Sequence, residues 1–387
     1  MNNPFKPGSG LFPPYFADRK REMDIFNNKL DQTISGSPMH MAIIGDWAMG
    51  KTSLLRQLTK SAEERNLFSC MIICPVTDSL DAFVDSISES ISDELKRTGK
   101  KNLRNKIVKS LSSVDNVGIS AFGFGAQAHK RQKSTTPQFA LRIGLRTVWD
   151  YLSDKHDGMV LLIDDIDLVS KDQEKTNDIM LTLRNALMEA INDDVRIMCV
   201  VSGTSLFKHV ESMHGPLVRF FEPFELTNLT ESEAKKAIEI PLEGTGVEFD
   251  RTTIDKILAT TNYHPYYLQE FCYFLFENAR NGVVNADTFD SLYNGIMHDL
   301  SRKMWTQRID ELGDVSLFLI SNIANGLNTS EALMKEGKKN KIQPNTLRST
   351  LTRLNNNGHL IRIGRGKYEL NDPLFGKYVS TIYMEKR

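Results

Sequence analysis

Short apolar runs alternate with amphipathic stretches through the first 226 residues of the chain. Four spans are almost continuously apolar, at residues 39–44, 69–76, 159–163 and 197–201, and a fifth short strand is expected around residues 221–226. Runs of this kind are typical of parallel strands covered on both faces, and residues with helical spacing lie between them. The alternation predicts a doubly wound α/β domain.

The pattern changes from about residue 315 onward. Helical spacing predicts three helices over residues 315–323, 329–336 and 344–356, and residues 359–370 fit a two-stranded hairpin. This order is that of a helix-turn-helix unit with an appended wing. We therefore expect a winged-helix domain in this part of the sequence.

A glycine-rich segment directly follows the first apolar run and fits the pattern G-x-x-x-x-G-K-[ST]. Its glycines allow backbone N–H groups to point at phosphates, Lys51 supplies a positive charge, and the Thr52 hydroxyl suits Mg²⁺. An ordinary turn is the alternative, but the preceding strand and the amphipathic helix from Ser53 to Leu58 favour a nucleoside triphosphate site. The residues predicted to bind the nucleotide here are Gly45, Asp46, Trp47, Ala48, Met49, Gly50, Lys51, Thr52 and Ser53.

Polar side chains follow the third and fourth apolar runs. The third run ends in Asp164 and Asp165, which we expect to hold Mg²⁺ and to polarise the attacking water, respectively. A solvated acidic turn is the alternative. The fourth run is followed by Ser202 and Thr204, either of which could hydrogen-bond the γ-phosphate or the water, or could cap a helix instead. Arg219 could reach the γ-phosphate of a neighbouring subunit or could be an ordinary surface residue.

Composition is that of a globular protein. The chain has 387 residues, 40% of them hydrophobic and 25% charged, which is enough for two or three domains. No stretch approaches the roughly 18 uncharged apolar residues of a membrane span, and residues 1–7 lack an apolar signal core. We expect a cytoplasmic protein without a membrane partner. Four cysteines in apolar runs are typical of buried thiols, and a metal site at Cys70 and Cys74 is the less favoured interpretation.

Together, the phosphate loop, the acidic strand end and the C-terminal module resemble the P-loop ATPases of the AAA+/STAND group. The resemblance is strongest to bacterial and archaeal ATPases related to origin-recognition replication initiators. It extends over nearly the whole chain and implies ATP as the nucleotide, a five-stranded core in the order 5-1-4-3-2, a helical lid and a winged helix. The implied boundaries are 1–226 for the core, with an inserted segment at 78–150, then 227–300 and 301–387.

The resemblance also implies further nucleotide contacts. The opening of the chain is similar to the family's adenine-side segment, in which a Gly-Arg pair is usual; here Asp18 precedes Arg19. A lid element similar to His-Pro-Tyr-x-Leu-Gln contributes His264 and Pro265, and Tyr263 stands where relatives have glycine. No arginine occupies the usual lid sensor position, which favours slow hydrolysis.

The lid region also carries local structural signals. Residues 229–234 have the character of a capping box at the start of a helix. The aromatic residues after His264 recur at helical spacing, which predicts that they belong to a helix core. These residues are Tyr266, Tyr267, Phe271, Tyr273 and Phe274.

Basic residues are concentrated in the C-terminal module. The sequence from residue 315 onward contains twelve lysines and arginines but only five acidic residues, in a chain whose net charge is −1. On the third helix Leu347, Leu351 and Leu354 predict a core side, and polar residues on the other side could meet base edges and phosphates of double-stranded DNA. The predicted DNA contacts are Asn345, Arg348, Ser349, Thr352, Arg353, Arg362, Arg365 and Lys367. Docking of a protein partner is the alternative.

Residues 117–133 alternate small and aromatic side chains, which suggests a hairpin or a surface loop. Two functions remain open on the sequence alone. The first is an ATP-dependent DNA-binding ATPase, whose homo-oligomer would use a trans arginine. The second is a slow or non-hydrolysing signalling switch whose winged helix docks a protein partner.

Overall fold

The computed structural model describes residues 2–8, 13, 15–17, 19–98, 136–204, 215–279 and 281–385. The chain divides into two compact units. The sheet unit comprises Asp18–Thr227, and the helical unit comprises Met1–Ala17 together with Asn228–Arg387. Each unit has its own hydrophobic core.

A five-stranded parallel sheet forms the centre of the sheet unit, with the strand order β2-β3-β4-β1-β5. This is the predicted order. Its strands are β1 (His40–Ile44), β2 (Phe68–Ile73), β3 (Met159–Asp164), β4 (Ile197–Gly203) and β5 (Phe221–Glu225). Strand β2 ends three residues earlier than the sequence suggested, just before Pro75, which has no N–H group to extend a strand ladder.

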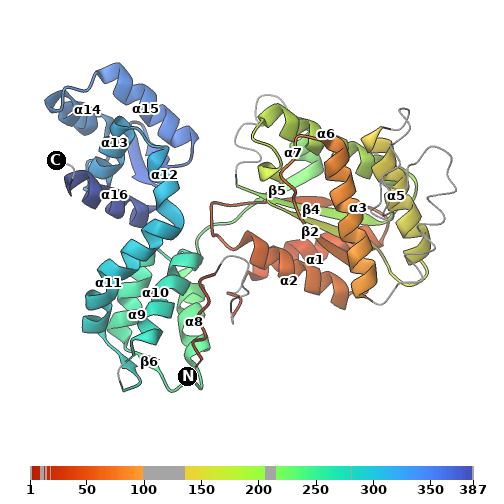
Figure 1. Ribbon diagram of the computed structural model, residues 1–387, viewed down its shortest axis with the longest axis horizontal. Helices are drawn as coiled ribbons and strands as arrows, with labels where there is room; N and C mark the ends of the chain where they lie inside the picture. Colours follow the sequence, from red (N-terminus) through yellow and green to blue (C-terminus); the bar gives the residue numbers. More distant parts are fainter. Residues whose placement is uncertain are drawn as a thin grey trace. The chain divides into compact units, whose positions relative to one another are not determined.

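Helices cover both faces of this sheet (Figure 1). One face is covered by α1 (Lys20–Ile34) and α2 (Lys51–Glu64). The other is covered by α3 (Leu80–Arg97), α5 (Pro137–Leu152) and α6 (Gln173–Asn192), with the short α7 (Gly215–Phe220) leading into β5. Strands β3 and β4 are buried along their whole length, which explains why they are continuously apolar.

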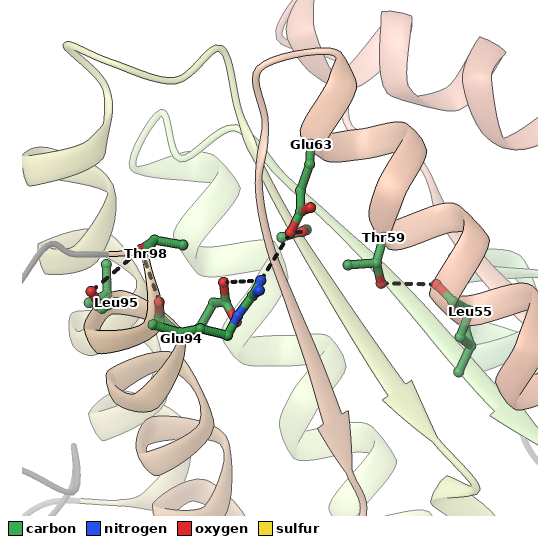
Figure 2. Close-up of polar contacts among 8 residues, drawn as sticks. Leu55, Thr59, Glu63, Glu94, Leu95 and Thr98 are labelled. Atoms are coloured by element: carbon green, nitrogen blue, oxygen red, sulfur yellow. Dashed lines mark hydrogen bonds and ion pairs between the residues drawn. The ribbon is translucent and has the colours of Figure 1, made fainter. Parts of the chain in front are cut away.

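An ion-pair network joins α2 to α3 beside strand β2. In Figure 2, dashed lines join Glu63 of α2 and Glu94 of α3 to the same guanidinium. The Arg97 guanidinium contacts Glu94 at 2.8 Å and Glu63 at 3.3 Å. Because Arg97 is largely exposed, the network contributes little to stability.

The first part of the helical unit contains α8 (Glu231–Leu242), α9 (Arg251–Thr261), α10 (Pro265–Glu277) and α11 (Ala286–Leu300). A two-residue parallel bridge joins β6 (Glu248–Phe249) to β7 (Val283–Val284). The predicted capping box is present, since Thr230 and Glu233 each bond the other's backbone N–H. The aromatic residues of α10 are buried or partly buried, as predicted, and Phe5 of the N-terminal segment packs against Phe249 in the same core.

The three helices and the hairpin predicted after residue 315 are all present. They are α13 (Asp314–Ala324), α14 (Ser330–Lys339), α15 (Pro344–Asn356), and the antiparallel pair β8 (Leu360–Gly364) and β9 (Lys367–Leu370). A π-helical turn (Ser301–Trp305) and α12 (Thr306–Asp310) precede them, and α16 (Pro373–Glu385) follows. Within the residues described, no helix has both the length and the apolar character that crossing a bilayer requires.

Candidate nucleotide-binding site

The glycine-rich segment forms a tight turn between β1 and α2. Gly50 and Ala48 have left-handed backbones, with φ of 87° and 59°. The turn allows α2 to begin directly at Lys51, so the unpaired N–H groups of its first turn lie at the loop. Gly45 lies against Leu226, whose Cβ would be only 3.1 Å from a side chain added at this glycine. The backbone therefore has the shape that a polyanion at a helix N-terminus requires.

Lys51 is buried, with 7% of its surface exposed. Its ammonium group donates to the carbonyl oxygens of Gly45 (2.9 Å) and Asp46 (3.1 Å), and to Oγ1 of Thr204 (3.2 Å). These acceptors match the three donors of an ammonium group. They place the charge between the phosphate loop and the end of β4, where phosphate oxygens can take over the same bonds.

Asp164 lies at the end of β3, in contact with two hydroxyl groups. Thr52 Oγ1 donates to one carboxylate oxygen at 2.6 Å, and Ser202 Oγ donates to the other at 2.5 Å. Ser202 also accepts a hydrogen bond from the backbone N–H of Asp165 at 3.0 Å. Ser202 is therefore a fully buried residue of β4 that bridges the two acids, and its hydroxyl does not cap a helix. The structure thus brings Thr52, Asp164, Asp165 and Ser202 together from three separate segments of the chain.

The hydroxyl of Thr52 and the carboxylate of Asp164 are hard oxygen donors, the kind that Mg²⁺ takes in proteins alongside water and substrate phosphates. Their separation of 2.6 Å puts both at one point beside the phosphate loop. The residues present therefore fit a magnesium ion.

Asp165 follows in a left-handed conformation, with φ of 49°. Burial, and then repulsion from the Asp164 carboxylate, raises the pKa of Asp165 above its ordinary value. Asp167 accepts a hydrogen bond from the backbone N–H of Thr204 at 2.7 Å, which ties the end of β4 to the segment after β3. Sequence reasoning gave Asp167 no role. Its only signal was its position as the third acid in the run 164–167.

Arg19 is buried beside the phosphate loop. Its guanidinium donates to the carbonyl of Thr227 (3.1 Å) and weakly to that of Met49 (3.5 Å), and it pairs with Glu22. Asp18, which precedes it, lies outside the described residues. The side chain of Trp47, at the tip of the loop, is 68% exposed.

Arg219 is exposed on α7 and donates to the carbonyl of Gly215, four residues earlier, at 3.1 Å. Across the described parts of the chain, no hydrogen bond or ion pair joins it to the phosphate loop or to the acids of β3. The remaining predicted nucleotide residues, His264 and Pro265, begin α10 in the helical unit. Just before them, Asn262 and Tyr263 have left-handed backbones, with φ of 48° and 60°.

The predicted DNA-contact residues lie on α15 and the β8–β9 hairpin, and all eight are exposed. Leu347, Leu351 and Leu354 are buried on the opposite side of α15, as predicted. Helix α14 packs closely on α15, because a Cβ at Gly337 would meet Leu347 at 2.3 Å. Arg353 turns back into the protein and donates to Ser316 Oγ at 2.9 Å.

All four cysteines are free thiols. Burial, and then the nearby acids Asp167 and Asp165, raises the pKa of Cys74 to about 12. The span 117–133, for which a hairpin or loop was predicted, lies outside the described residues.

The fold and the site define a P-loop nucleotide-binding ATPase. Residues 15–192 match a family described as the AAA ATPase domain, so this part of the chain is an AAA ATPase domain and the predicted resemblance is confirmed. No curated protein sequence matches the chain.

Two solved structures have the same fold over almost their full length. The Walker-type ATPase of Pyrococcus abyssi aligns with a TM-score of 0.64 at 12% identity, covering 94% of this chain and 96% of that one. The ORC2 protein of Aeropyrum pernix, solved as ADPNP and ADP complexes, aligns with a TM-score of 0.62 at 12% identity, covering 98% and 96%. At this identity the likeness concerns the fold.

Proposed function

We propose that this ATPase is a nucleotide-controlled switch that binds double-stranded DNA through a winged helix formed by α13, α14, α15 and the β8–β9 hairpin. The observation that carries the proposal is the exposed basic surface on α15 and the hairpin, in a chain that also holds a nucleotide site. Arg348, Arg362, Arg365 and Lys367 all contribute charge to this surface. Phosphate contacts by such residues supply most of the affinity of sequence-independent DNA binding.

In hydrolysis, Lys51 neutralises charge on the β- and γ-phosphates, and Asp165 orients the attacking water. Thr52 and Asp164 would hold Mg²⁺, which would supply the positive charge that neutralises the phosphates. Ser202 positions both acids through its two hydrogen bonds. Thr204 lies against the Lys51 ammonium, so we assign it as the hydroxyl that faces the γ-phosphate.

Asp167 acts through Thr204 and is a positioning residue. Its carboxylate receives the Thr204 N–H and thereby sets the direction of the hydroxyl that contacts Lys51. The whole loop from Gly45 to Ser53 would surround the phosphates, and Arg19 would stabilise the loop from the side of Met49.

Contacts from outside the loop complete this proposal. His264 and Pro265 would contact the nucleotide from the helical unit. Arg219 would stabilise the γ-phosphate of a neighbouring copy in a homo-oligomer, since its exposed guanidinium bonds only a carbonyl of its own helix among the contacts described. If Arg219→Ala leaves turnover unchanged in concentrated, assembled protein, this role is wrong.

A second candidate function is a slow signalling switch whose winged helix docks a protein. It is favoured by two half-exposed apolar residues on the hairpin, Ile361 (47%) and Ile363 (49%), which a protein partner would cover.

A DNA-binding assay titrated with salt, with and without ATP, separates the two functions. We expect the affinity to fall steeply with salt and the slope of log K against log salt to decrease by about 2 in Arg348→Ala/Arg365→Ala, since each phosphate contact contributes about 0.9. The control Lys235→Ala/Arg251→Ala removes two exposed positive charges from α8 and α9 and should leave the slope unchanged. Absence of binding at low salt would exclude the DNA-binding function.

The nucleotide site is tested separately by calorimetry and by turnover. Lys51→Ala should abolish ATP binding, because the ammonium is buried at the loop. Asp165→Asn should keep binding and reduce turnover by about 10² or more, the usual contribution of a general base. Equal turnover in Asp165→Asn and the parent protein would reject the assignment of this residue.

A further inference from the structure

The helical unit contains a buried polar network that begins at the first turn of α10. Tyr267 is 2% exposed, and its ring stacks on that of His264 with centroids 4.2 Å apart. Its hydroxyl donates to a carboxylate oxygen of Asp372 at 2.7 Å and accepts a hydrogen bond from the Trp305 indole at 3.1 Å. One buried phenol therefore connects the start of α10 to two residues that are 38 and 105 positions away in sequence.

Asp372 connects this phenol to the base of the β8–β9 hairpin. Its second oxygen accepts the Phe375 N–H at 3.0 Å and so caps α16. Arg308 donates to the oxygen shared with Tyr267 at 3.0 Å, and its guanidinium lies 4.0 Å from the ring centre of Phe375. The same guanidinium lies 3.3 Å from Nδ1 of His359, the residue just before β8.

Asp372 and His359 thus flank the hairpin at its base. The carbonyl of His359 accepts the N–H of Asn371 at 3.1 Å, which closes the ladder below the pair Leu360 and Leu370. A shift of the Asp372 carboxylate would therefore move both the cap of α16 and the root of the hairpin that carries Arg362 and Arg365.

The π-helical turn Ser301–Trp305 contacts α10 through an ion pair and a hydrogen bond. Lys303 of this turn pairs with the buried Glu270 and with Asp299, each at 2.6 Å, while Trp305 bonds Tyr267. A π-turn holds one residue more than an α-helical turn, and such turns are frequent at functional sites. If this turn changed to an α-helical turn, the residues on one side of it would rotate about the helix axis by about 100°, the rotation of one residue. This rotation would break the contacts of Lys303 with Glu270 and of Trp305 with Tyr267 together.

We propose that Tyr267 is the positioning residue through which the His264 end of α10 controls the hairpin, so that nucleotide bound near His264 changes how the basic surface is presented. This inference rests on the proposed nucleotide contact of His264. Coupling needs a physical element that both sites bias, and here that element is the hydrogen-bonded set Tyr267, Trp305, Asp372 and Arg308. Burial, and then the charge of Asp372, raises the pKa of Tyr267 well above its ordinary value, so its hydroxyl remains a donor at working pH.

Hydrogen exchange measured by mass spectrometry, with and without a non-hydrolysable ATP analogue, tests this coupling in the full chain. In the parent protein we expect nucleotide to slow exchange at the phosphate loop and to change exchange in residues 359–375. In Tyr267→Phe the loop should respond as before, and the change at 359–375 should be lost. Tyr273→Phe, which removes a hydroxyl from the same helix outside the network, should behave like the parent.

Asp372→Asn serves as a second variant if Tyr267→Phe folds poorly, because it keeps an oxygen for the Phe375 N–H and removes the charge that pairs with Arg308. A change at residues 359–375 that persists in both variants overturns the inference, as does a parent protein whose loop responds while these residues do not. Where the parent binds DNA, the affinity ratio with and without nucleotide, about 5-fold or more for typical coupling, should approach 1 in Tyr267→Phe. Exchange coupling without any DNA affinity supports the role of Tyr267 and overturns only the DNA-binding function.

Discussion

His40 makes the sheet unit sensitive to acid. It begins β1 and is 3% exposed, its ring stacks on Phe220 at 4.2 Å, and its Nδ1 accepts the backbone N–H of Cys199 at 3.0 Å. Burial, and then the positive charge of Lys29, lowers the pKa of His40 to about 3. The folded protein therefore holds this imidazole neutral well into the acid range.

The sign and size of the effect follow from linkage. In the unfolded chain His40 takes up a proton as the pH falls below about 6.5, whereas the folded protein resists protonation down to about pH 3. The unfolded state then binds more protons, so the free energy of unfolding decreases as the pH falls through this window. At pH 4.5, two units below the ordinary pKa, the loss is about 2.7 kcal/mol, since each unit corresponds to about 1.4 kcal/mol.

His40→Asn tests this reasoning, because the asparagine carbonyl can still accept the Cys199 N–H but does not titrate. Native-state hydrogen exchange of peptides from β1 and β4 measures the local free energy of opening at pH 7.5 and 4.5. We expect the parent protein to lose about 2.7 kcal/mol more than the variant between these two values. The variant is also expected to be less stable at both, since it loses the ring contact with Phe220. Equal losses in the two proteins would refute the assignment.

Two further predictions concern carboxylates. Asp167→Ala should lower kcat by about 10-fold or more with little change in KM, because it frees the Thr204 backbone without removing a contact with ATP. Asp167→Asn should restore most of the rate, because its amide carbonyl can accept the same N–H. A wild-type rate in Asp167→Ala would exclude the positioning role. Burial raises the pKa of Glu270 to about 7, so the folded helical unit keeps a proton that the unfolded chain releases near its ordinary value. The free energy of unfolding of the helical unit should therefore decrease as the pH rises from about 4.5 to 7, by at most about 1.4 kcal/mol per pH unit. Hydrogen exchange in α10 measures this pH dependence, which should be weaker in Glu270→Gln. The same pH dependence in the variant and the parent protein would contradict the prediction.

The parts of the site that lie on consecutive residues could be predicted from the sequence. The phosphate loop is one continuous segment, and the apolar runs around it identify buried parallel strands. Because such strands all end at the same edge of a sheet, Asp164 could be placed beside Thr52 although 112 residues separate them. The order of the strands came from the family resemblance, since apolar pattern alone does not fix which strands are neighbours.

Contacts set by side-chain direction could not be predicted. Helical spacing placed Arg353 on the polar side of α15, but only the structure shows that its guanidinium turns toward Ser316. The two candidate hydroxyls of β4 also looked equivalent in the sequence. Ser202 points toward the acids from within the strand, and Thr204, just past its end, contacts Lys51. In the proposed mechanism, this difference of two residues along one strand end separates a positioning role for Ser202 from a direct role for Thr204.

Tyr263 shows why a departure from a family pattern does not by itself change the backbone. The family resemblance implies glycine at this position, and the backbone here keeps the left-handed conformation that glycine favours, with φ of 60°. A left-handed conformation costs a residue with a side chain about 1–2 kcal/mol. Two interactions hold Tyr263 in place: its carbonyl accepts the Leu229 N–H at 3.1 Å, and its ring packs on the core of the helical unit. The turn into His264 is therefore preserved at the expense of local strain, immediately before the residue that stacks on Tyr267.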